Sequence, residues 1–436
     1  MSVRETAGVF ATLLRDPLAV HIQTAARHGD AVRMPIGRHR SSFLFSRPEY
    51  AEHVLVLNQD NYAKAATYRP LRALMGDGLL TSEGAKWRKH RRLIQPVFSR
   101  RDVLRFGPFM SDAAQRMLKD WDEQPAGTVL NVSRRMSALT LDIVGGALFG
   151  ADLTGETAAM ARTMDAGQRV ALLSALLPLP WGPRSTRVVK AAARRLGGTP
   201  EGVEGMVAKL ITQRRAQGHK GDPVDLLDVL IQSDLTDPEI GAEVGTFMLA
   251  GHETTANTLS WSLALLAAYP QARARMEEEV DAVLGGNVPA AADAGRLPWT
   301  AAVVAEAMRL YPPAWTIERS AIADDDVVGI EVPAGSQATI GVYLIHRHRE
   351  FWPDPAGFDP GRFLGDADRP RYAYIPFGGG RRACVGQSFA ELEAVLVLAS
   401  IAQRYRLELT GRTLPATAAN VTLRPGSTLP MRLLRR

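Results

Sequence analysis

The sequence has a single cysteine, Cys384, among 436 residues. One cysteine excludes a disulfide within the chain, and it also excludes zinc or iron–sulfur sites built from four cysteines of one chain. No apolar run approaches the ~18 residues that cross a membrane. The N-terminus lacks the apolar core and cleavage site of a signal peptide. We therefore expect a cytoplasmic protein with no stable membrane insertion.

The sequence also lacks repeats and low-complexity linkers, so nothing divides residues 1–436 into separate domains. Its composition, 46% hydrophobic and 22% charged, is typical of a globular protein with a substantial core. The net charge is +6, but the basic residues are mostly scattered and no nucleic-acid fold signature surrounds them. We expect no nucleic-acid partner and a monomeric chain.

Hydrophobic periodicity predicts a mainly α fold with a small β portion and no alternating βαβ pattern. Helical patterns dominate between residues 102 and 269. The clearest helix begins at "LTDPEI", where we predict Asp237 as the N-cap, and it ends before Pro270. The other expected elements are helices over 271–285, 299–311 and 388–405, and strand-like segments over 30–37, 41–46 and 317–344.

Polar residues interrupt the middle of this long apolar helix, at "AGHETT" (250–255). Gly251 costs about 1 kcal/mol of helix stability relative to alanine. A carboxylate such as Glu253 is expensive to bury unless it is paired or used, and Thr254 can bond its own backbone. A kinked helix with satisfied polar groups explains each residue separately. Taken together, they indicate a groove in which an acid and an alcohol deliver protons.

The motif "FGGGRRACVG" (377–386) places the one thiol among four glycines and two arginines. Its glycines match a loose nucleotide-binding pattern, but no βαβ unit and no acidic residue follow at the required distance. A nucleophilic cysteine needs a histidine base, and the sequence does not show which of its nine histidines lies near Cys384. A purely structural thiol leaves the glycines unexplained.

A thiolate ligand to haem iron explains more of the motif. Glycines allow the loop to pass closely under a flat macrocycle. Backbone N–H groups at the start of the following helix and nearby arginines are expected to lower the thiol pKa. Phe377 would shield the sulfur of Cys384, and Arg382 would bind a haem propionate.

A third feature is "EAMR", in which Glu306 and Arg309 share one helix face and can pair. Such pairs are common on solvent-exposed helices, so this pair alone does not indicate a functional site. Farther along, "FDPGRF" offers Arg362 as a third member of a network.

These motifs together resemble the cytochrome P450 family. The cysteine motif resembles its haem-binding signature, "AGHETT" its oxygen-activation segment, and "EAMR" its E-x-x-R motif. "FDPGRF" is similar to its arginine-bearing meander, and "WRKHR" (87–91) to the W-x-x-x-R of its propionate-binding helix. The matches follow the family's order from residue 87 to 386. The meander departs from the family's pattern at Gly361, where glutamate is common, and we expect a looser loop there.

The resemblance implies a role for each matching residue. Cys384 would be the proximal iron ligand, and Glu253 and Thr254 the catalytic acid–alcohol pair that delivers protons. Glu306, Arg309 and Arg362 would stiffen the cysteine pocket. The residues that would contact the haem cofactor (haem b) are Trp87, Arg91, Ala250, Gly251, Arg319, Phe377, Gly378, Arg382, Cys384 and Gly386.

The implied reaction is insertion of one oxygen atom of dioxygen into a small molecule. Electrons would come from a ferredoxin or flavodoxin with its reductase, because no reductase domain follows the motif. A basic face is expected to dock this acidic partner; its residues would be Arg100, Arg101, Arg381 and the segment 86–92.

By family analogy, the substrate pocket draws on residues 68–80, 170–182, 313–317 and 420–425. These segments are mainly aliphatic, which favours a neutral apolar substrate such as a terpenoid, steroid or lipid of secondary metabolism. The run 172–181 could also touch a membrane surface. Three alternatives stay open: a peroxide-using or oxygen-independent haem enzyme, a haem-based sensor or carrier, and a cysteine-dependent hydrolase.

Overall fold

The structure is a computed structural model of the chain. It describes residues 16–36, 40–153, 185–218, 221–365 and 368–436, together with positions 155, 159, 162–163, 166–167 and 169–170. Helices make up most of the fold, and the strands form small sheets, so the predicted fold class is confirmed. Of the described helices, none is both long and apolar enough to cross a membrane.

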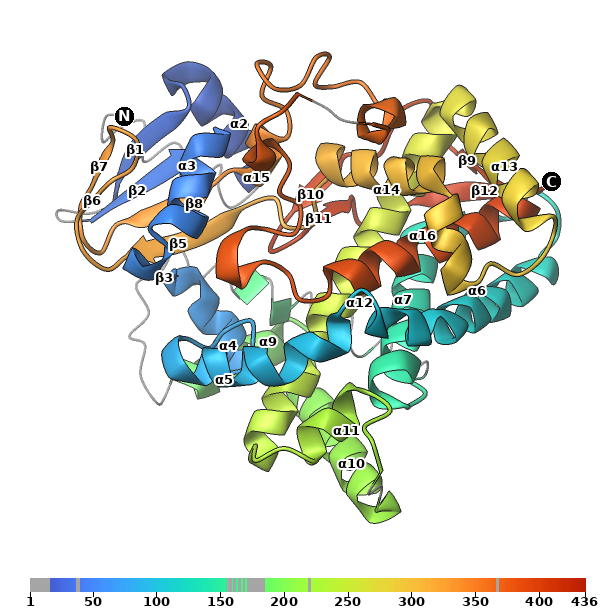
Figure 1. The fold of residues 1–436 in the computed structure, drawn as a ribbon, viewed down its shortest axis with the longest axis horizontal. Coiled ribbons are helices and arrows are strands. Elements are labelled where there is room, and N and C mark those ends of the chain that lie inside the picture. The colour runs from blue at the N-terminus through green and yellow to red at the C-terminus, as the bar shows by residue number, and fades with distance from the viewer. Residues whose placement is uncertain are drawn as a thin grey trace.

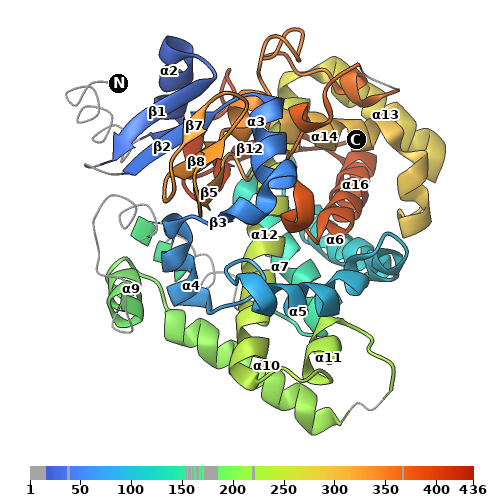
Figure 2. The same ribbon diagram turned by 60° about the vertical axis from the view of Figure 1, so that its left-hand side comes forward.

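The helix α12 (Asp237–Ala268) runs through the interior, where it packs against α7 (Val132–Phe149), α10 (Pro200–Gln217), α14 (Pro298–Leu310) and α16 (Gln387–Arg404). Figure 2 shows α12 behind the loop that precedes α16, with α7 beside it. Most of its residues are buried, as its apolar flanks predict. The other described helices are α2 (Pro17–His28), α3 (Pro48–Glu52), α4 (Arg69–Met75), α5 (Gly84–Ile94), α6 (Gly107–Asp122), α9 (Ser185–Arg195), α11 (Leu226–Ile231), α13 (Pro270–Leu284) and α15 (Val342–Ile345).

The largest sheet has the strand order β1-β2-β8-β5-β3 and lies on the side of the molecule that carries the N-terminal strands (Figure 1). Its strands are β1 (Ala31–Ile36), β2 (Arg40–Phe45), β3 (Tyr62–Lys64), β5 (Ile317–Ala321) and β8 (Gln337–Ile340). β2 and β8 pair in parallel, whereas the other neighbours are antiparallel. The sheet therefore joins the first segment of the chain to the segment after α14.

Three smaller antiparallel sheets complete the fold, with orders β4-β12-β9, β10-β11 and β6-β7. The hairpin β10-β11 lies near the middle of the molecule in Figure 1, close to α12. The strands are β4 (Val129–Asn131), β6 (Asp325–Asp326), β7 (Glu331–Val332), β9 (Tyr405–Leu409), β10 (Thr417–Ala419), β11 (Leu423–Pro425) and β12 (Pro430–Arg435).

The start of α12 differs from the prediction. Thr236, not Asp237, is the N-cap, and Asp237 is the first helical residue. The Glu239 carboxylate accepts hydrogen bonds from the Thr236 backbone N–H at 3.0 Å and from its hydroxyl at 2.9 Å. A carboxylate in the first turn that reaches back to the cap stabilises the helix start. Thr236 and Asp237 can both cap a helix, and the hydrogen bonds with Glu239 select Thr236.

Candidate active site

The predicted acid–alcohol segment lies in the middle of α12. Ala250 is exposed, and Gly251, Glu253 and Thr254 are half-buried, although the helix on either side is buried. The Thr254 hydroxyl donates to the Ala250 carbonyl at 2.7 Å, which is the predicted bond to its own backbone. Accessible polar groups at the centre of a buried helix mark a place where a ligand can approach α12.

Gly251 allows close packing on another side of the helix. A side-chain carbon at this position would lie 3.0 Å from Cγ2 of Val144 in α7. The adjacent His252 is buried and its Nε2 lies 2.7 Å from the Ser137 hydroxyl, also in α7. Burial lowers the pKa of His252 to about 4, so this imidazole is neutral at pH 7. His252 therefore fixes α12 to α7 rather than adding charge beside Glu253.

The cysteine loop leads into α16, which packs against α12. The backbone N–H of Cys384 donates to the Phe377 carbonyl at 2.9 Å and closes the loop. Phe377 is partly buried and packs against the main core. The Cys384 side chain is exposed, as a ligand to an incoming cofactor must be.

The protein alone does not lower the pKa of the thiol, contrary to the prediction. Desolvation by the surrounding protein raises the pKa of Cys384, although its sulfur keeps accessible surface. A hydrogen bond from the Gly386 backbone and the charge of Arg91 act in the opposite direction but are outweighed. A coordinating metal ion deprotonates a thiol outright, so the expected iron would have to supply the ionisation of Cys384.

The glycines of the loop are explained by the chain's own contacts. Gly378 and Gly380 have φ values of 73° and 65°, in the region that favours glycine. A side-chain carbon at Gly380 would lie 1.9 Å from the Leu55 carbonyl oxygen, and one at Gly379 would lie 2.8 Å from the Tyr372 ring. Gly378, Gly379 and Gly380 therefore serve backbone conformation and packing, and the predicted clearance for a macrocycle stays a prediction.

Cationic side chains gather beside this loop. The Arg382 guanidinium lies 4.2 Å from the centre of the Trp87 ring and donates to the Ser82 carbonyl at 2.9 Å. It also pairs with Glu83. Burial, with the nearby charge of Arg319, lowers the pKa of Arg382 to about 10. The structure thus brings Trp87 and Arg319 each close to Arg382, and propionate binding by these residues stays a prediction.

Lys64 belongs to the same cation cluster, and no sequence motif predicts it. Burial and the charges of Arg319 and Arg382 hold the pKa of Lys64 well below its usual range, while Glu83 acts in the opposite direction. Burial disfavours the charged forms of both Lys64 and the Glu318 carboxyl beside Arg319, so Arg319 and Arg382 facing Glu83 leave a local excess of positive charge. An anionic group such as a propionate fits this excess.

Arg91 lies one helical turn from Trp87, and its guanidinium donates to the Ala383 carbonyl at 3.0 Å. This bond ties α5 to the residue before Cys384. Two predicted residues of "WRKHR" therefore contact the cysteine loop from the same helix. Trp87 contacts Arg382 of the loop, and Arg91 donates a hydrogen bond to the loop backbone at Ala383.

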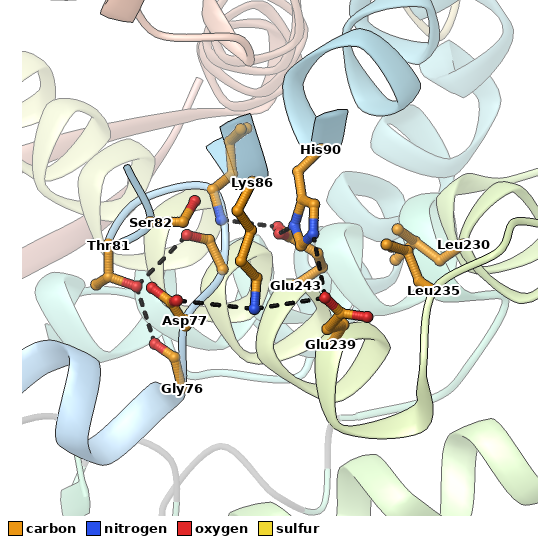
Figure 3. Close-up of polar contacts among 12 residues, drawn as sticks. Gly76, Asp77, Thr81, Ser82, Lys86, His90, Leu230, Leu235, Glu239 and Glu243 are labelled. Atoms are coloured by element: carbon orange, nitrogen blue, oxygen red, sulfur yellow. Dashed lines mark hydrogen bonds and ion pairs between the residues drawn. The ribbon is translucent and has the colours of Figure 1, made fainter. Parts of the chain in front are cut away.

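The helix α5 is fastened to α12 by a buried pair (Figure 3). His90 points toward α12, where its Nδ1 lies 2.5 Å from Oε1 of Glu243; both side chains are fully buried. The other Glu243 oxygen accepts the backbone N–H of Leu79 at 3.0 Å. Near this pair, Nζ of Lys86 lies 3.5 Å from Oε1 of Glu239 and 3.7 Å from Oδ2 of Asp77. The helix that carries Trp87 and Arg91 is thus held against the helix that carries Glu253.

Replacing Glu243 with glutamine tests this fastening. Glu243→Gln keeps the shape but removes the charge, so we expect the free energy of unfolding to fall by about 1–3 kcal/mol. Chemical denaturation of the purified protein measures the change. The control is Lys89→Gln on the same helix, which breaks the exposed pair Lys89–Asp234 and should cost at most about 1 kcal/mol. Equal losses in both variants would contradict a special contribution of the buried pair.

The predicted network of Glu306, Arg309 and Arg362 is present. Glu306 and Arg309 are fully buried and form two parallel hydrogen bonds of 2.7 Å. Arg362 Nε lies 3.4 Å from Oε1 of Glu306. The Gly361 N–H donates to the Asp359 carboxylate at 2.9 Å, and the looser loop expected at Gly361 stays a prediction.

The cytochrome P450 family model matches residues 9–429, nearly the whole chain. The chain belongs to the cytochrome P450 family. It is therefore an oxidoreductase that uses a haem-thiolate cofactor and dioxygen, binds a small substrate and receives electrons from a redox partner. The exposed cysteine and the cation cluster fit such a cofactor, because they offer a sulfur ligand for iron and positive charge for propionates.

Three bacterial cytochrome P450s are similar to this chain over most of its length. It is 36% identical to a putative cytochrome P450 132 of Mycobacterium tuberculosis, over 87% of this chain and 85% of that protein. It is 33% identical to cyclooctatin synthase of Streptomyces melanosporofaciens, over 96% of this chain and 93% of that protein. It is 32% identical to pentalenene oxygenase of Streptomyces avermitilis, over 91% of this chain and 88% of that protein.

Of the predicted pocket segments, 68–80, 313–317 and 420–425 are described, and residues 171–182 lie outside the described residues. Trp315 is buried, and its indole N–H donates to the Asn420 carbonyl at 2.9 Å, so two of these segments meet. The third segment contains α4 and also Leu79, whose backbone N–H donates to the Glu243 carboxylate at 3.0 Å. These described segments therefore contact each other or α12.

Proposed function

We propose that the protein is a monooxygenase that inserts one oxygen atom of dioxygen into an apolar small molecule. The observation that carries this proposal is the accessible pair of Glu253 and Thr254 at the centre of α12. A carboxyl group and an alcohol next to each other can pass protons from the interior to a reacting oxygen. When bound, the haem supplies the electron-transfer and O–O cleavage chemistry; these side chains supply the protons.

We further propose haem b as the cofactor. Cys384 would hold the iron, with Phe377, Gly378 and Gly386 shaping the loop around it. Lys64, Trp87, Arg91, Arg319 and Arg382 would hold the propionates, and Ala250 and Gly251 would border the oxygen site. The cation cluster around Glu83 supports this assignment.

A terpenoid is the substrate class that we favour over a steroid or another lipid. Two relatives are named for acting on cyclooctat-9-en-7-ol and on pentalenene. In this chain, the pocket segments offer apolar residues such as Val421, which is 39% exposed. We place the activity in secondary metabolism and in the cytoplasm, carried out by a monomeric single-domain protein.

A ferredoxin or flavodoxin is the proposed electron donor. Arg88, Arg92, Arg100 and Arg101 are exposed, and they offer a positive surface to an acidic protein. Arg88 and Arg92 also line a surface hollow together with Lys89. Arg381 contributes less than predicted, because it already pairs with Asp60.

Replacing Thr254 with alanine tests the proposed chemistry. With electrons supplied by a surrogate ferredoxin system and a substrate found by spin-state shifts, Thr254→Ala should lower product formation by about 10²-fold, as expected for one positioned proton-transfer group. Electron consumption should continue, with hydrogen peroxide released instead of product. Product and peroxide per consumed NADPH are the quantities to measure.

Thr258→Ala is the matched control for this test, because Thr258 makes the same kind of backbone bond one turn later, to the Thr254 carbonyl at 3.0 Å. This control should keep the ratio of product to NADPH near that of the wild type. If Thr254→Ala also kept it, the monooxygenase assignment would be wrong and a peroxide-using haem enzyme would be favoured.

A further inference from the structure

The turn between β10 and β11 contacts the proposed catalytic acid directly. The Thr422 hydroxyl, which is almost fully buried, donates a hydrogen bond to Oε1 of Glu253. The side-chain amide of Asn257, one turn farther along α12, donates to the same hydroxyl oxygen at 3.4 Å. A residue 169 positions away in sequence thus bridges two side chains on the active-site face of α12.

The same turn is fixed on its other side to the segment that follows α14. The Leu423 backbone N–H donates to the Pro313 carbonyl at 3.0 Å, and the Trp315 indole donates to the Asn420 carbonyl at 2.9 Å. Between these anchors, Val421 is exposed while Thr422 and Leu423 are buried. The turn therefore presents one apolar side chain outward and one hydroxyl inward to Glu253.

A glutamate side chain has several rotatable bonds, so its carboxylate must be held in place to exchange a proton at a productive distance. His252 does not hold it through charge, since this neighbour is neutral and bonded to Ser137. A hydrogen bond from a buried hydroxyl to a carboxylate is short and strong, and it selects one orientation. Thr422 makes such a bond.

We propose that Thr422 is a positioning residue for Glu253 and that it links the substrate-facing turn to proton delivery. This inference rests on the proposed function of Glu253. A molecule that contacts Val421 moves or steadies the adjacent Thr422, and this changes the orientation of the carboxylate. Substrate occupancy then favours productive use of electrons over release of peroxide.

A double-mutant cycle tests the contact itself. Unfolding of the haem-loaded protein is compared among wild type, Thr422→Val, Glu253→Leu and the double variant, because each single change removes one partner of the hydrogen bond. We expect the two changes to be coupled by about tenfold in the unfolding equilibrium constant. Additive effects would show that the hydroxyl and the carboxylate do not interact, and they would overturn the proposal.

The second test separates positioning from packing. Thr422→Val should lower the product formed per consumed NADPH by about tenfold and raise the peroxide accordingly, whereas Thr422→Ser keeps the hydroxyl and should restore coupling. Thr417→Val makes the same change at the open end of the hairpin, where Thr417 pairs with Pro425, and should leave coupling unchanged.

Three results of these experiments are distinguishable. If Thr422→Val keeps full coupling while Thr254→Ala loses it, the role of Thr422 is wrong and the proposed function stands. If Thr422→Ser is as uncoupled as Thr422→Val, the residue acts through packing and the positioning role is also wrong. If Thr254→Ala is fully coupled, the proposed function itself fails.

Discussion

Cys384→Ser is expected to abolish the red-shifted Soret band that a thiolate-ligated haem gives after reduction in the presence of carbon monoxide. Serine has nearly the same shape, but its hydroxyl is not ionised near neutral pH and is a harder donor than a thiolate. Product formation should fall below detection at the same time. A reduced carbon monoxide difference spectrum and product analysis measure the two effects.

The control for this result is Ala383→Ser, which adds a hydroxyl next to the thiol and leaves Cys384 in place. It should keep the band. Far-UV circular dichroism of Cys384→Ser should match the wild type, because the loop is closed by the backbone bond between Cys384 and Phe377 rather than by the sulfur. Because the chain has one cysteine, a band that survives in Cys384→Ser would refute the thiolate ligand altogether.

The positions of the main motifs could be predicted because each depends on a short stretch of chain. The polar interruption in α12 and the loop before α16 stand out against apolar helices, and periodicity places both on or beside those helices. The pairing of Glu306 with Arg309 follows from helical spacing alone. The mainly α fold was predicted from hydrophobic periodicity, and the motifs then indicated the family.

Contacts between distant segments could not be predicted in this way. Lys64 lies in a short strand with no motif, and it joins Arg319 only because β3 pairs with β5. Thr422 meets Glu253 through the packing of a hairpin on α12. The pKa of Cys384 depends on how much protein surrounds the sulfur, which spacing does not show. In each case, tertiary packing determines the chemistry.

Removal of the Arg309 guanidinium should have the largest effect on stability. Its side chain is fully buried, pairs with Glu306, and also donates to the carbonyls of His346, Pro355 and Gly357 at 3.0, 2.8 and 2.8 Å. Arg309→Met would leave the Glu306 carboxylate buried and partly uncompensated, which costs about 3–5 kcal/mol. Since a typical protein is stable by about 5–15 kcal/mol, little folded haem-loaded protein should accumulate.

Arg309→Lys keeps this prediction testable where the methionine variant does not fold. Lysine keeps the charge but cannot bind the carboxylate with two parallel bonds or reach three carbonyls at once, so unfolding of the purified protein should show a loss of at least about 2 kcal/mol. Arg296→Met breaks an exposed i,i+3 pair with Asp293 and should cost no more than about 1 kcal/mol. A loss in Arg309→Lys as small as that of the control would contradict a structural role for the network.

The effect should extend to the cofactor site, because the network holds the segment that enters the cysteine loop. His346, whose carbonyl binds Arg309, accepts the backbone N–H of Ile375 on its Nε2 at 2.8 Å. The Tyr374 hydroxyl donates to the Ala305 carbonyl at 2.9 Å, on the same helix as Arg309. Arg309→Lys should therefore lose haem to apomyoglobin faster than wild type, whereas Arg296→Met should not.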